Sequence, residues 1–402
     1  MLIVKKFGGS SVANKERIFN VAKRCIEDYR AGHDVVVVLS AMGDTTDDLI
    51  ALANTINPNA KKRELDMLLT TGEQVSVSLM AMAMQALDVP AVSLKAFQVM
   101  MHSTSLYGNA RFKRVDTARI MHELDSRKIV IVTGFQGVNK YDDITTLGRG
   151  GSDTTAVALA AVLHADKCEI YTDVDGVFTA DPRVVKTAKK LDAVTYDEML
   201  ELASLGAKVL HNRSVEMAKK YNVELVVRSS LNRSEGTVVK EGANMEKLLV
   251  TGVAADKDTV RISVIGLEDK PGTAFAVFNT LAANNINVDI ILQSVGREGT
   301  KDISFTVASD DLEHAIEVLN ANKERLTIQD ITWNKKVAKL SIVGAGMMSN
   351  PGVAAKMFES LYNSRVNINM ISTSEIRITV LVPEEDIEKA MNAVHDGFGL
   401  GA

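Results

Sequence analysis

Two glycine-rich stretches of the 402-residue chain carry charged side chains that could hold an anion. The first, "KKFGGSS", places Lys6 shortly before Gly8 and Gly9. A lysine supplies a point charge for phosphate, and glycines let backbone N–H groups approach an anion closely. The same letters are also typical of an ordinary turn with exposed lysines. No GxxxxGK[ST] pattern occurs, so a phosphate site here is not of the P-loop type.

The second stretch, "GRGGSDTTAVALAAVL", surrounds Arg149 with three glycines ahead of an alanine-rich apolar run. Ser152 or Asp153 would suit the cap of a helix, which requires no function. Capping needs neither the glycines nor the arginine, however, and glycines lower local stability. An arginine beside the N–H groups of a helix start is a good clamp for a carboxylate or phosphate, and we interpret the stretch as an anion site.

Hydroxyls and a carboxylate occur in two further stretches. "LSAMGDTTDDLI" places Ser40 and Thr46 after a buried apolar run, although, taken alone, Asp44 or Thr45 as a helix cap is the better explanation of its composition. "TTGEQ" places Glu73 at the start of an apolar helix. A carboxylate there is favourable against the helix dipole without any function, or it could pair with a substrate ammonium group.

Acidic residues crowd "YTDVDGVFTADPR", which contains Asp173, Asp175 and Asp181. The DG and DP pairs in it are also common turn chemistry. Lys208, in "GAKVLH", is either a solvated helix lysine or a second lysine for phosphate. No HExxH or CxxC pattern occurs, so we expect no dedicated metal site in the protein.

Strands and helices must bring these stretches together, and both are predicted along residues 1–245. The runs "LIVKKF", "DVVVVL", "KIVIVTGF", "KCEIYTDV" and "VELVVRS" are typical of strands, several of them covered on both faces. Helical patterns such as "NKERIFNVAKRCIEDYRA" lie between them. We therefore predict an α/β fold around a largely parallel sheet, with ligands at the carboxyl ends of its strands.

The last 160 or so residues contain an internal duplication. Shifted by 80 positions, Pro271 and Gly272 meet Pro351 and Gly352 in "DKPGTAF" and "SNPGVAA". Each copy predicts a ferredoxin-like βαββα unit. The domains expected are a catalytic domain over 1–245 and two repeats over 258–328 and 329–402, with a strand at 248–256 that could join the second repeat.

The net charge of −5 argues against a nucleic-acid or anionic membrane partner, because both select basic surfaces. The two cysteines, Cys25 and Cys168, lie in regular segments without a metal-ligand pattern, which favours a reducing compartment. The chain shows neither a signal peptide nor an apolar run of about 20 residues. We expect a cytoplasmic protein.

The ordered set "KFGGS", "LSAMGDTTD", "TTGEQ", "GRGGSDTTAVALA", "YTDVDGVFTADPR" and "GAKVLH" resembles the aspartate kinases of the amino-acid kinase family. The tail "PGVAAKMFESL…NINMISTSEIRITVLV" resembles their paired ACT regulatory domains, so the resemblance covers essentially the whole chain. One departure is Ser10, where the family more often has threonine, and a hydroxyl is kept. The resemblance implies ATP-dependent phosphorylation of the L-aspartate side chain to 4-phospho-L-aspartate, the first step towards lysine, threonine and methionine.

The resemblance also implies roles for matching residues, with Mg²⁺ as cofactor. The nucleotide would be held by Lys6, Phe7, Gly8, Gly9, Ser40, Thr172, Asp173, Phe178, Asp181, Arg183 and Lys208. Aspartate would be held by Thr46, Glu73, Arg149, Gly150, Gly151 and Ser152. Asp153 would orient Lys6, and Lys208 would add charge. The attacking carboxylate is already ionised, so positioning and charge neutralisation suffice without a general base.

Regulation and assembly follow from the same resemblance. Lysine, alone or with threonine, would bind at the repeats through Asp269, Asn287, Gln293, Asn367, Ile368, Ser374 and Glu375, unless the duplication is only structural. We expect a homo-oligomer, or an α₂β₂ assembly whose β subunit starts at Met245. The hypothesis of an internal start depends on "KEGANM", because its Lys-Glu codons can spell a purine-rich ribosome-binding sequence.

Two alternatives lie close to this interpretation. Glutamate 5-kinase, acetylglutamate kinase and uridylate kinase are kinases of the same fold, but the tandem tail and "GRGGSDTT" argue against them. A non-catalytic amino-acid sensor would not need Lys6 or Arg149. We expect no fused homoserine dehydrogenase, since nothing follows the second repeat.

Overall fold

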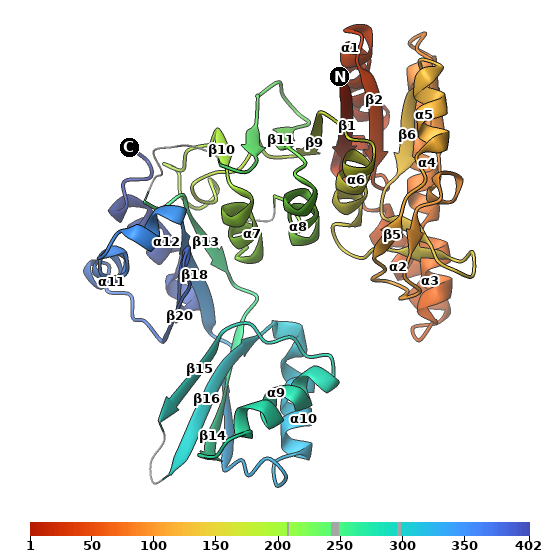
Figure 1. The fold of residues 1–402 in the computed structure, drawn as a ribbon. Helices are drawn as coiled ribbons and strands as arrows, with labels where there is room; N and C mark the ends of the chain where they lie inside the picture. The colour runs from red at the N-terminus through yellow and green to blue at the C-terminus, as the bar shows by residue number, and fades with distance from the viewer. Residues whose placement is uncertain (207–208, 243–248, 296–298) are drawn as a thin grey trace. The chain divides into compact units, whose positions relative to one another are not determined.

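The structure is a computed structural model that describes residues 1–206, 209–242, 249–295 and 299–402. The chain divides into two compact units (Figure 1). The described residues of the first unit are 1–177, 190–203 and 209–242, and those of the second are 178–189, 204–206, 249–295 and 299–402.

An eight-stranded sheet forms the centre of the first unit. In spatial order its strands are β10 (Ala193–Val194), β12 (Thr237–Val239), β11 (Leu225–Ser229), β9 (Lys167–Thr172), β1 (Leu2–Phe7), β2 (Asp34–Leu39), β6 (Ile129–Thr133) and β3 (Ala91–Leu94). Neighbouring strands are parallel except for β11 and β12. The predicted, largely parallel sheet is therefore confirmed.

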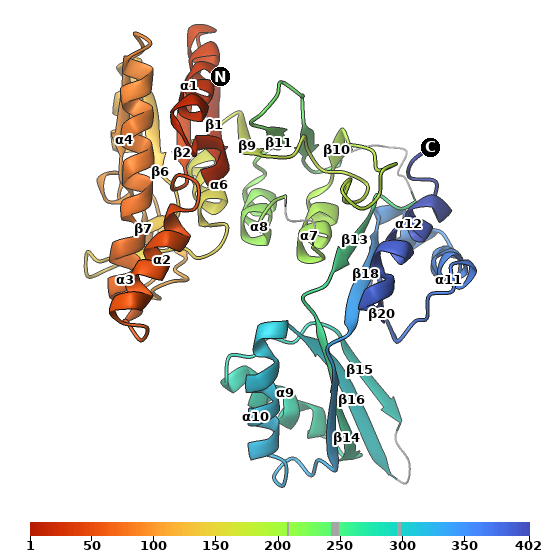
Figure 2. The same ribbon diagram turned by 180° about the vertical axis from the view of Figure 1, so that it is seen from behind.

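Helices cover both faces of this sheet (Figures 1 and 2), with α1 and α4 on one side and α6 and α8 on the other. The helices of the first unit are α1 (Lys15–Arg30), α2 (Thr45–Ile56), α3 (Lys62–Leu69), α4 (Thr71–Gln85), α5 (Ala118–Asp125), α6 (Gly151–Val162), α7 (Tyr196–Ser204) and α8 (Asn212–Tyr221). On α1, buried Ile18, Val21, Ala22 and Cys25 recur at helical spacing and so form the face that packs on the core.

A smaller sheet lies in the same unit. Its strands, in spatial order, are β5 (Phe112–Arg114), β4 (His102–Ser103), β7 (Gln136–Val138) and β8 (Ile144–Thr146). Strand β8 contacts α3 and leads into the turn before α6. This sheet therefore fixes the chain just ahead of the "GRGG" stretch.

The central strands of the large sheet end level with one another. Phe7 on β1 is in register with Leu39 on β2 and Tyr171 on β9, and Leu39 is in register with Thr133 on β6. The chain segments that follow these strands therefore meet at one edge of the sheet, where parallel sheets bind ligands.

The helix caps differ from the expected ones. Helix α6 begins at Gly151 after a left-handed Gly150, so Ser152 and Asp153 lie in its first turn and do not cap it. Asp44 precedes α2, but its side chain makes no capping hydrogen bond. The positive φ of 66° at Gly150 ends the preceding turn, and the Asp153 carboxylate is instead paired with Lys6.

The second unit contains two four-stranded antiparallel sheets with two helices each, as the ferredoxin-like prediction requires. The first repeat consists of β14 (Val260–Glu268), α9 (Thr273–Ala283), β15 (Ile291–Val295), β16 (Thr300–Val307), α10 (Leu312–Ala321) and β17 (Asp330–Asn334). The second consists of β18 (Val337–Val343), α11 (Val353–Asn363), β19 (Met370–Thr373), β20 (Arg377–Pro383) and α12 (Ile387–Gly397). The extra strand of the second repeat is β13 (Gly252–Asp256), which pairs with β18.

The segment 178–189 folds with the second unit, although the sequence places it within the expected domain 1–245. Ala180 and Val185 are buried in the apolar core of the second repeat. The Thr179 carbonyl accepts a hydrogen bond of 2.7 Å from the Val253 N–H. Because these apolar side chains are buried in the second repeat, this segment belongs to the second unit although it comes from the middle of the expected catalytic domain.

None of the helices in the described part of the chain combines the length and the apolar character that a bilayer crossing requires.

Candidate active site

Lys6 and Asp153 form an ion pair at the edge of the large sheet. The Lys6 Nζ lies 2.6 Å from Asp153 Oδ1, and the two side chains are 13% and 11% exposed. Lys6 comes from β1, and Asp153 comes from the first turn of α6. A Cβ at Gly8 would lie 3.6 Å from the Lys6 Nζ, so the ammonium group lies directly over the glycine turn.

The turn after β1 packs closely against the segment that follows β2. The Gly43 N–H donates a 3.0 Å hydrogen bond to the Gly9 carbonyl. A Cβ at Gly9 would lie 2.7 Å from the Ala41 carbonyl oxygen, which is closer than real side chains approach. Only glycine fits this position without a shift of backbone, and the close packing fixes the turn below Lys6.

Three elements meet around Ser40. Its Oγ donates a 3.0 Å hydrogen bond to the Ser152 Oγ at the start of α6. The Ala41 N–H donates to Glu73 Oε1 at 3.2 Å, and the Ser76 Oγ donates to the Ser40 carbonyl at 2.8 Å. The ends of β2, α4 and α6 are therefore joined, which brings together the predicted residues Ser40, Glu73 and Ser152. Thr46 is half-buried in the first turn of α2, just beyond this segment.

Glu73 is a buried carboxyl group whose second oxygen lacks a partner. The residue is 2% exposed, and Oε2 makes no hydrogen bond to the described residues. Burial raises the pKa of this carboxyl group from its ordinary value to about 7, against the opposing hydrogen bond from the Ala41 N–H. The site therefore holds a carboxyl group whose ionised form would gain strongly from a cationic ligand.

The turn that carries Arg149 is held by the start of α8. Gly150 is left-handed, and a Cβ there would overlap the ring of His211. Burial lowers the pKa of His211, although Asp153 opposes the shift, so the ring is neutral near pH 7. Gly151 is buried behind the turn, whereas the Arg149 side chain is exposed and directed to solvent.

Arg213, two residues beyond His211, fixes the same turn from the first turn of α8. Its guanidinium group donates to the carbonyls of Leu147 at 2.6 Å and Ala110 at 2.9 Å. Sequence reasoning missed both His211 and Arg213, although His211 is the last residue of the quoted "GAKVLH" stretch and Arg213 lies two residues beyond it. An arginine that fixes backbone carbonyls leaves no periodic pattern that could reveal it.

The expected nucleotide residues are only partly brought together. Thr172 and Asp173 follow β9 at the same edge, where the Thr172 Oγ1 donates to Asp173 Oδ1 at 3.0 Å. The Phe7 ring is fully buried and stacks on Tyr171 at 4.4 Å, so its side chain faces the core and not a ligand. Lys208 lies outside the described residues.

Three further nucleotide candidates belong to the second unit. Asp181 accepts hydrogen bonds of 2.7–3.1 Å from the Arg183 guanidinium group, and Phe178 begins the same segment. The structure therefore does not assign these residues to the cluster around Lys6.

A surface pocket of about 460 Å³ lies in the second repeat and includes two of the expected regulatory residues, Ser374 and Glu375. Its other lining residues are Met347, Asn350, Gly352, Val353, Ala354, Thr373 and Ile378. Asn367 is exposed outside it, and Ile368 packs against the core of the repeat.

The expected regulatory residues of the first repeat are all exposed. Asp269 forms a 2.7 Å ion pair with Lys301. Asn287 precedes β15, and Gln293 lies within that strand opposite Ile303. They are not lining residues of the pocket in the second repeat.

The chain is similar to known proteins over its whole length. The sequence model of the amino acid kinase family matches residues 1–229, and ACT domain models match residues 260–324 and 340–398. The aspartokinase of Bacillus sp. (strain MGA3) is 53% identical over 400 residues, which are 99% of this chain and 97% of that protein.

Solved structures agree with the sequence comparison. The crystal structure of E. coli aspartokinase III in complex with aspartate and ADP (R-state) matches with a TM-score of 0.85 and 26% identity, over 99% of both chains. The same enzyme in complex with lysine and aspartate (T-state) matches with a TM-score of 0.79 and 27% identity, again over 99% of both chains.

Proposed function

The chain belongs to the aspartate kinases of the amino acid kinase family, and from this premise we propose that it transfers the γ-phosphoryl group of ATP to the side-chain carboxylate of L-aspartate. The observation that carries the proposal is the Lys6–Asp153 ion pair over the Gly8–Gly9 turn, beside the buried Glu73. This cluster offers a cation for phosphate and a carboxylate for an ammonium group on adjoining elements.

Aspartate would bind through its two α-substituents. The unpaired Oε2 of Glu73 suits the α-ammonium group, which would compensate the buried negative charge. The exposed guanidinium of Arg149 suits the α-carboxylate, since arginine binds carboxylates with two parallel hydrogen bonds. Thr46, Gly150, Gly151 and Ser152 would complete the contacts, leaving the side-chain carboxylate towards the nucleotide.

ATP would bind over the glycine turn. Lys6 and the backbone N–H groups at Gly8 and Gly9 suit its phosphates, with Ser40 close to the transferred group and Thr172 and Asp173 beside the nucleoside. The resemblance also implies Lys208, Phe178, Asp181 and Arg183 for the nucleotide; the last three belong to the second unit, and Lys208 lies outside the described residues. Asp153 would keep Lys6 in position rather than take up a proton.

The chemical step needs no general base. An oxygen of the aspartate carboxylate attacks the γ-phosphorus, the bond from that phosphorus to the bridging oxygen breaks, and ADP leaves with the electron pair. No proton is transferred, because the attacking group is already ionised. The catalytic task is therefore to align the two anions and to neutralise the charge on the transferred group.

Mg²⁺ fits this site as a companion of the nucleotide. No group of three or more His, Cys, Asp or Glu side chains suited to a metal ion occurs in the described part of the chain. Mg²⁺ commonly keeps several waters and binds through substrate phosphates with one or two carboxylates. It would be held mainly by the phosphates of ATP and would supply charge neutralisation there.

We further propose that the two repeats bind lysine, alone or together with threonine, and thereby reduce activity. Support comes from the pocket that includes Ser374 and Glu375, since a carboxylate and hydroxyls suit the two ends of an amino acid. E. coli aspartokinase III has been crystallised with lysine. The product would then enter the synthesis of lysine, threonine and methionine. The proposed assembly is a homo-oligomer, or α₂β₂ with a start at Met245, which lies outside the described residues.

The first test is ATP-dependent formation of aspartyl hydroxamate with Mg²⁺, with and without lysine plus threonine. Hydroxamate from L-aspartate is the expected result, and inhibition by lysine, alone or with threonine, would support the regulatory proposal. Turnover of glutamate or UMP in place of aspartate would contradict the assignment. Uninhibited turnover of aspartate would contradict only the regulatory part.

A further inference from the structure

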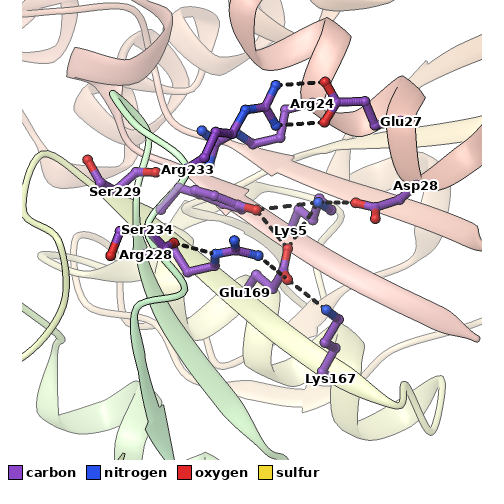
Figure 3. Close-up of polar contacts among 11 residues, drawn as sticks. Lys5, Arg24, Glu27, Asp28, Lys167, Glu169, Arg228, Ser229, Arg233 and Ser234 are labelled. Carbon is purple, nitrogen blue, oxygen red and sulfur yellow. Dashed lines mark hydrogen bonds and ion pairs between the residues drawn. The ribbon is translucent and has the colours of Figure 1, made fainter. Parts of the chain in front are cut away.

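A network of buried charges lies on the face of the large sheet that α1 covers (Figure 3). The Lys5 Nζ lies 3.0 Å from Glu169 Oε2 and also pairs with Asp28 on α1. Glu169 Oε1 accepts hydrogen bonds from Lys167 at 2.8 Å and Arg228 at 3.2 Å. Lys5 and Glu169 are each 1% exposed, so their charges are shielded from water.

Glu169 keeps its charge despite this burial. Burial alone would raise the pKa of the carboxyl group, but Lys5 and Lys167 lower it to about 2. The carboxylate therefore acts as a fixed anchor for the side chains around it, because each of its oxygens accepts two of the donors.

Tyr171 connects this anchor to Arg24. Its OH group donates a 2.8 Å hydrogen bond to Glu169 Oε2, and its ring stacks on Phe7 with an interplanar angle of 9°. The guanidinium carbon of Arg24 lies 4.9 Å from the centre of the same ring, within the range of a cation–π contact. Phe7, which directly precedes the Gly8–Gly9 turn, is thus packed on Tyr171, and Tyr171 in turn contacts Arg24.

Arg24 reaches from α1 to the turn that follows β11, residues 229–234. Its Nη1 donates to the Ser229 carbonyl at 2.9 Å, and its Nη2 donates to the Asn232 carbonyl. Arg228 holds the far end of this turn, because its Nε donates to the Ser234 carbonyl at 3.2 Å. Two arginines of the network therefore fix three carbonyls of the 229–234 turn.

The fixed turn lies beside the expected nucleotide residues. The Ser230 N–H donates to the Thr172 carbonyl at 2.8 Å, and the Ser11 Oγ donates to the Ser230 Oγ at 2.9 Å. The Asn232 Nδ2 donates to Asp175 Oδ1 at 2.6 Å. The 229–234 turn is thereby attached both to the segment after β9 and to the glycine turn.

We propose that Arg24 is a positioning residue for ATP, an inference that rests on the proposed function. It holds the 229–234 turn as a fixed wall beside Thr172 and the glycine turn, so that the nucleotide enters a site already formed. Arg24 does not touch the nucleotide itself, because it is 7% exposed and its two Nη atoms are already engaged by the turn.

A lysine cannot replace Arg24 in this role. The planar guanidinium group donates to two carbonyls in a fixed fork while its face lies on Tyr171, whereas a lysine presents a single ammonium group. Arg24→Lys keeps the positive charge but removes the planar group that donates to two carbonyls at once. Arg233→Lys is the matched control, since Arg233 lies in the same turn but pairs only at the surface with Glu27, at 59% and 58% exposure.

The experiment measures KM for ATP, KM for aspartate and kcat, with the dissociation constant of Mg-ADP by calorimetry. For Arg24→Lys we expect KM for ATP and the Mg-ADP dissociation constant to rise about tenfold, the effect of one or two lost hydrogen bonds. KM for aspartate and kcat should stay within about twofold of the wild type, as should every constant of Arg233→Lys.

An unchanged affinity of Arg24→Lys for both nucleotides would overturn the proposal. So would a fall in kcat alone, which indicates less folded enzyme. If Arg24→Lys does not fold, Asn232→Ala removes the hydrogen bond to Asp175 and the one that the Asn232 Oδ1 accepts from the Ser234 N–H within the turn. This variant should weaken Mg-ADP binding about threefold, and no change there overturns the proposal. A wild type that binds Mg-ADP but does not phosphorylate aspartate would contradict the proposed function and still leave Arg24 testable by calorimetry.

Discussion

Lys5 and Lys6 are neighbours in the chain but project to opposite faces of the large sheet. Lys5 is buried against Asp28 of α1 and Glu169, whereas Lys6 pairs with Asp153 of α6 at the candidate active site. Figures 1 and 2 show α1 and α6 on the two sides of β1. Because side chains alternate along a strand, one dipeptide supplies a structural cation and a functional one.

Loss of the Lys6 ammonium group is expected to disable phosphoryl transfer. Lys6→Ala should lower kcat in the hydroxamate assay about 10²–10³-fold, because a preorganised cation no longer meets the charge on the transferred group. Lys15→Ala, at the exposed start of α1, is the control and should retain wild-type kcat. A Lys6→Ala enzyme within threefold of the wild type would contradict the proposed role.

Aspartate binding is expected to depend on the ionisation of Glu73. Since the pKa of Glu73 is about 7 without ligand, about one tenth of the protein carries the ionised carboxylate at pH 6 and about nine tenths at pH 8. KM for aspartate should therefore be about tenfold higher at pH 6 than at pH 8. Glu73→Gln should give a high KM that is the same at both pH values. A wild-type KM that does not change with pH would speak against the ammonium contact.

The same shift in pKa makes a prediction for stability in the absence of aspartate. Folding raises the pKa of Glu73 from 4.5 to about 7, so its contribution to stability is present below pH 4.5 and is lost as the pH rises through about 7. Glu73→Gln should therefore be more stable than the wild type at pH 8 in urea unfolding, with the difference vanishing near pH 4.5. A constant difference across this range would argue against a raised pKa.

Gly150→Ala is expected to disturb the turn that carries Arg149. Alanine in the left-handed region costs about 1–2 kcal/mol, and the new Cβ would overlap His211 as well. KM for aspartate should rise and the free energy of unfolding should fall. The matched control is Gly32→Ala, where φ is 90° but nothing lies within 4 Å of the new Cβ. Equal losses in the two variants would show that the overlap with His211 is unimportant.

Glu169→Gln is expected to destabilise the first unit severely. Removing one charge from a buried network typically costs about 3–5 kcal/mol, because the remaining charges are left unpaired. Glu27→Gln breaks only the exposed pair with Arg233 and should cost at most about 1 kcal/mol. Since the pKa of Glu169 is lowered to about 2, its contribution is present above its ordinary value of 4.5 and is lost as the pH falls towards 2. Urea unfolding of both variants at pH 7 and pH 3 would test this difference.

Inhibition by lysine is expected to require Glu375. Glu375→Ala should raise the lysine concentration for half-inhibition about tenfold, since a charge-assisted contact in the second-repeat pocket is lost. Glu359→Ala, on the exposed side of α11, serves as the control. An unchanged inhibition curve for Glu375→Ala would move the lysine site elsewhere.

The order of strands and helices could be predicted from the sequence because apolar runs such as "DVVVVL" report burial directly. The meeting of Lys6 with Asp153, and of Ser40 with Ser152, follows from the carboxyl ends of parallel strands. The start of α6 could not be placed, because Ser152 and Asp153 suit a cap as well as a first turn. Their actual partners, Ser40 and Lys6, are distant in sequence.

The role of Arg24 could not be predicted from the sequence. Arg24 lies on a helix among other charged residues, and nothing in "AKRCIEDYR" distinguishes a buried arginine from a solvated one. Lys5 and Glu169 each interrupt an apolar strand, which was the one available sign that their charges are paired. Partners more than a hundred residues apart can be matched only once the sheet order is known.

The segment 178–189 has a consequence for anyone who would cut this enzyme in two. A truncated kinase ending near residue 245 would carry Ala180 and Val185 without the core that buries them in the second repeat. The same cut would remove the Val253 N–H that donates to the Thr179 carbonyl. It would also remove the His395 Nε2, which lies 3.0 Å from the Thr179 Oγ1. A catalytic fragment would therefore expose these apolar side chains. It should tend to aggregate and should be cleaved readily by proteases in that segment. Removing the proposed inhibition by lysine through a deletion should therefore fail, whereas a point substitution in the second repeat should remove it and leave the enzyme folded.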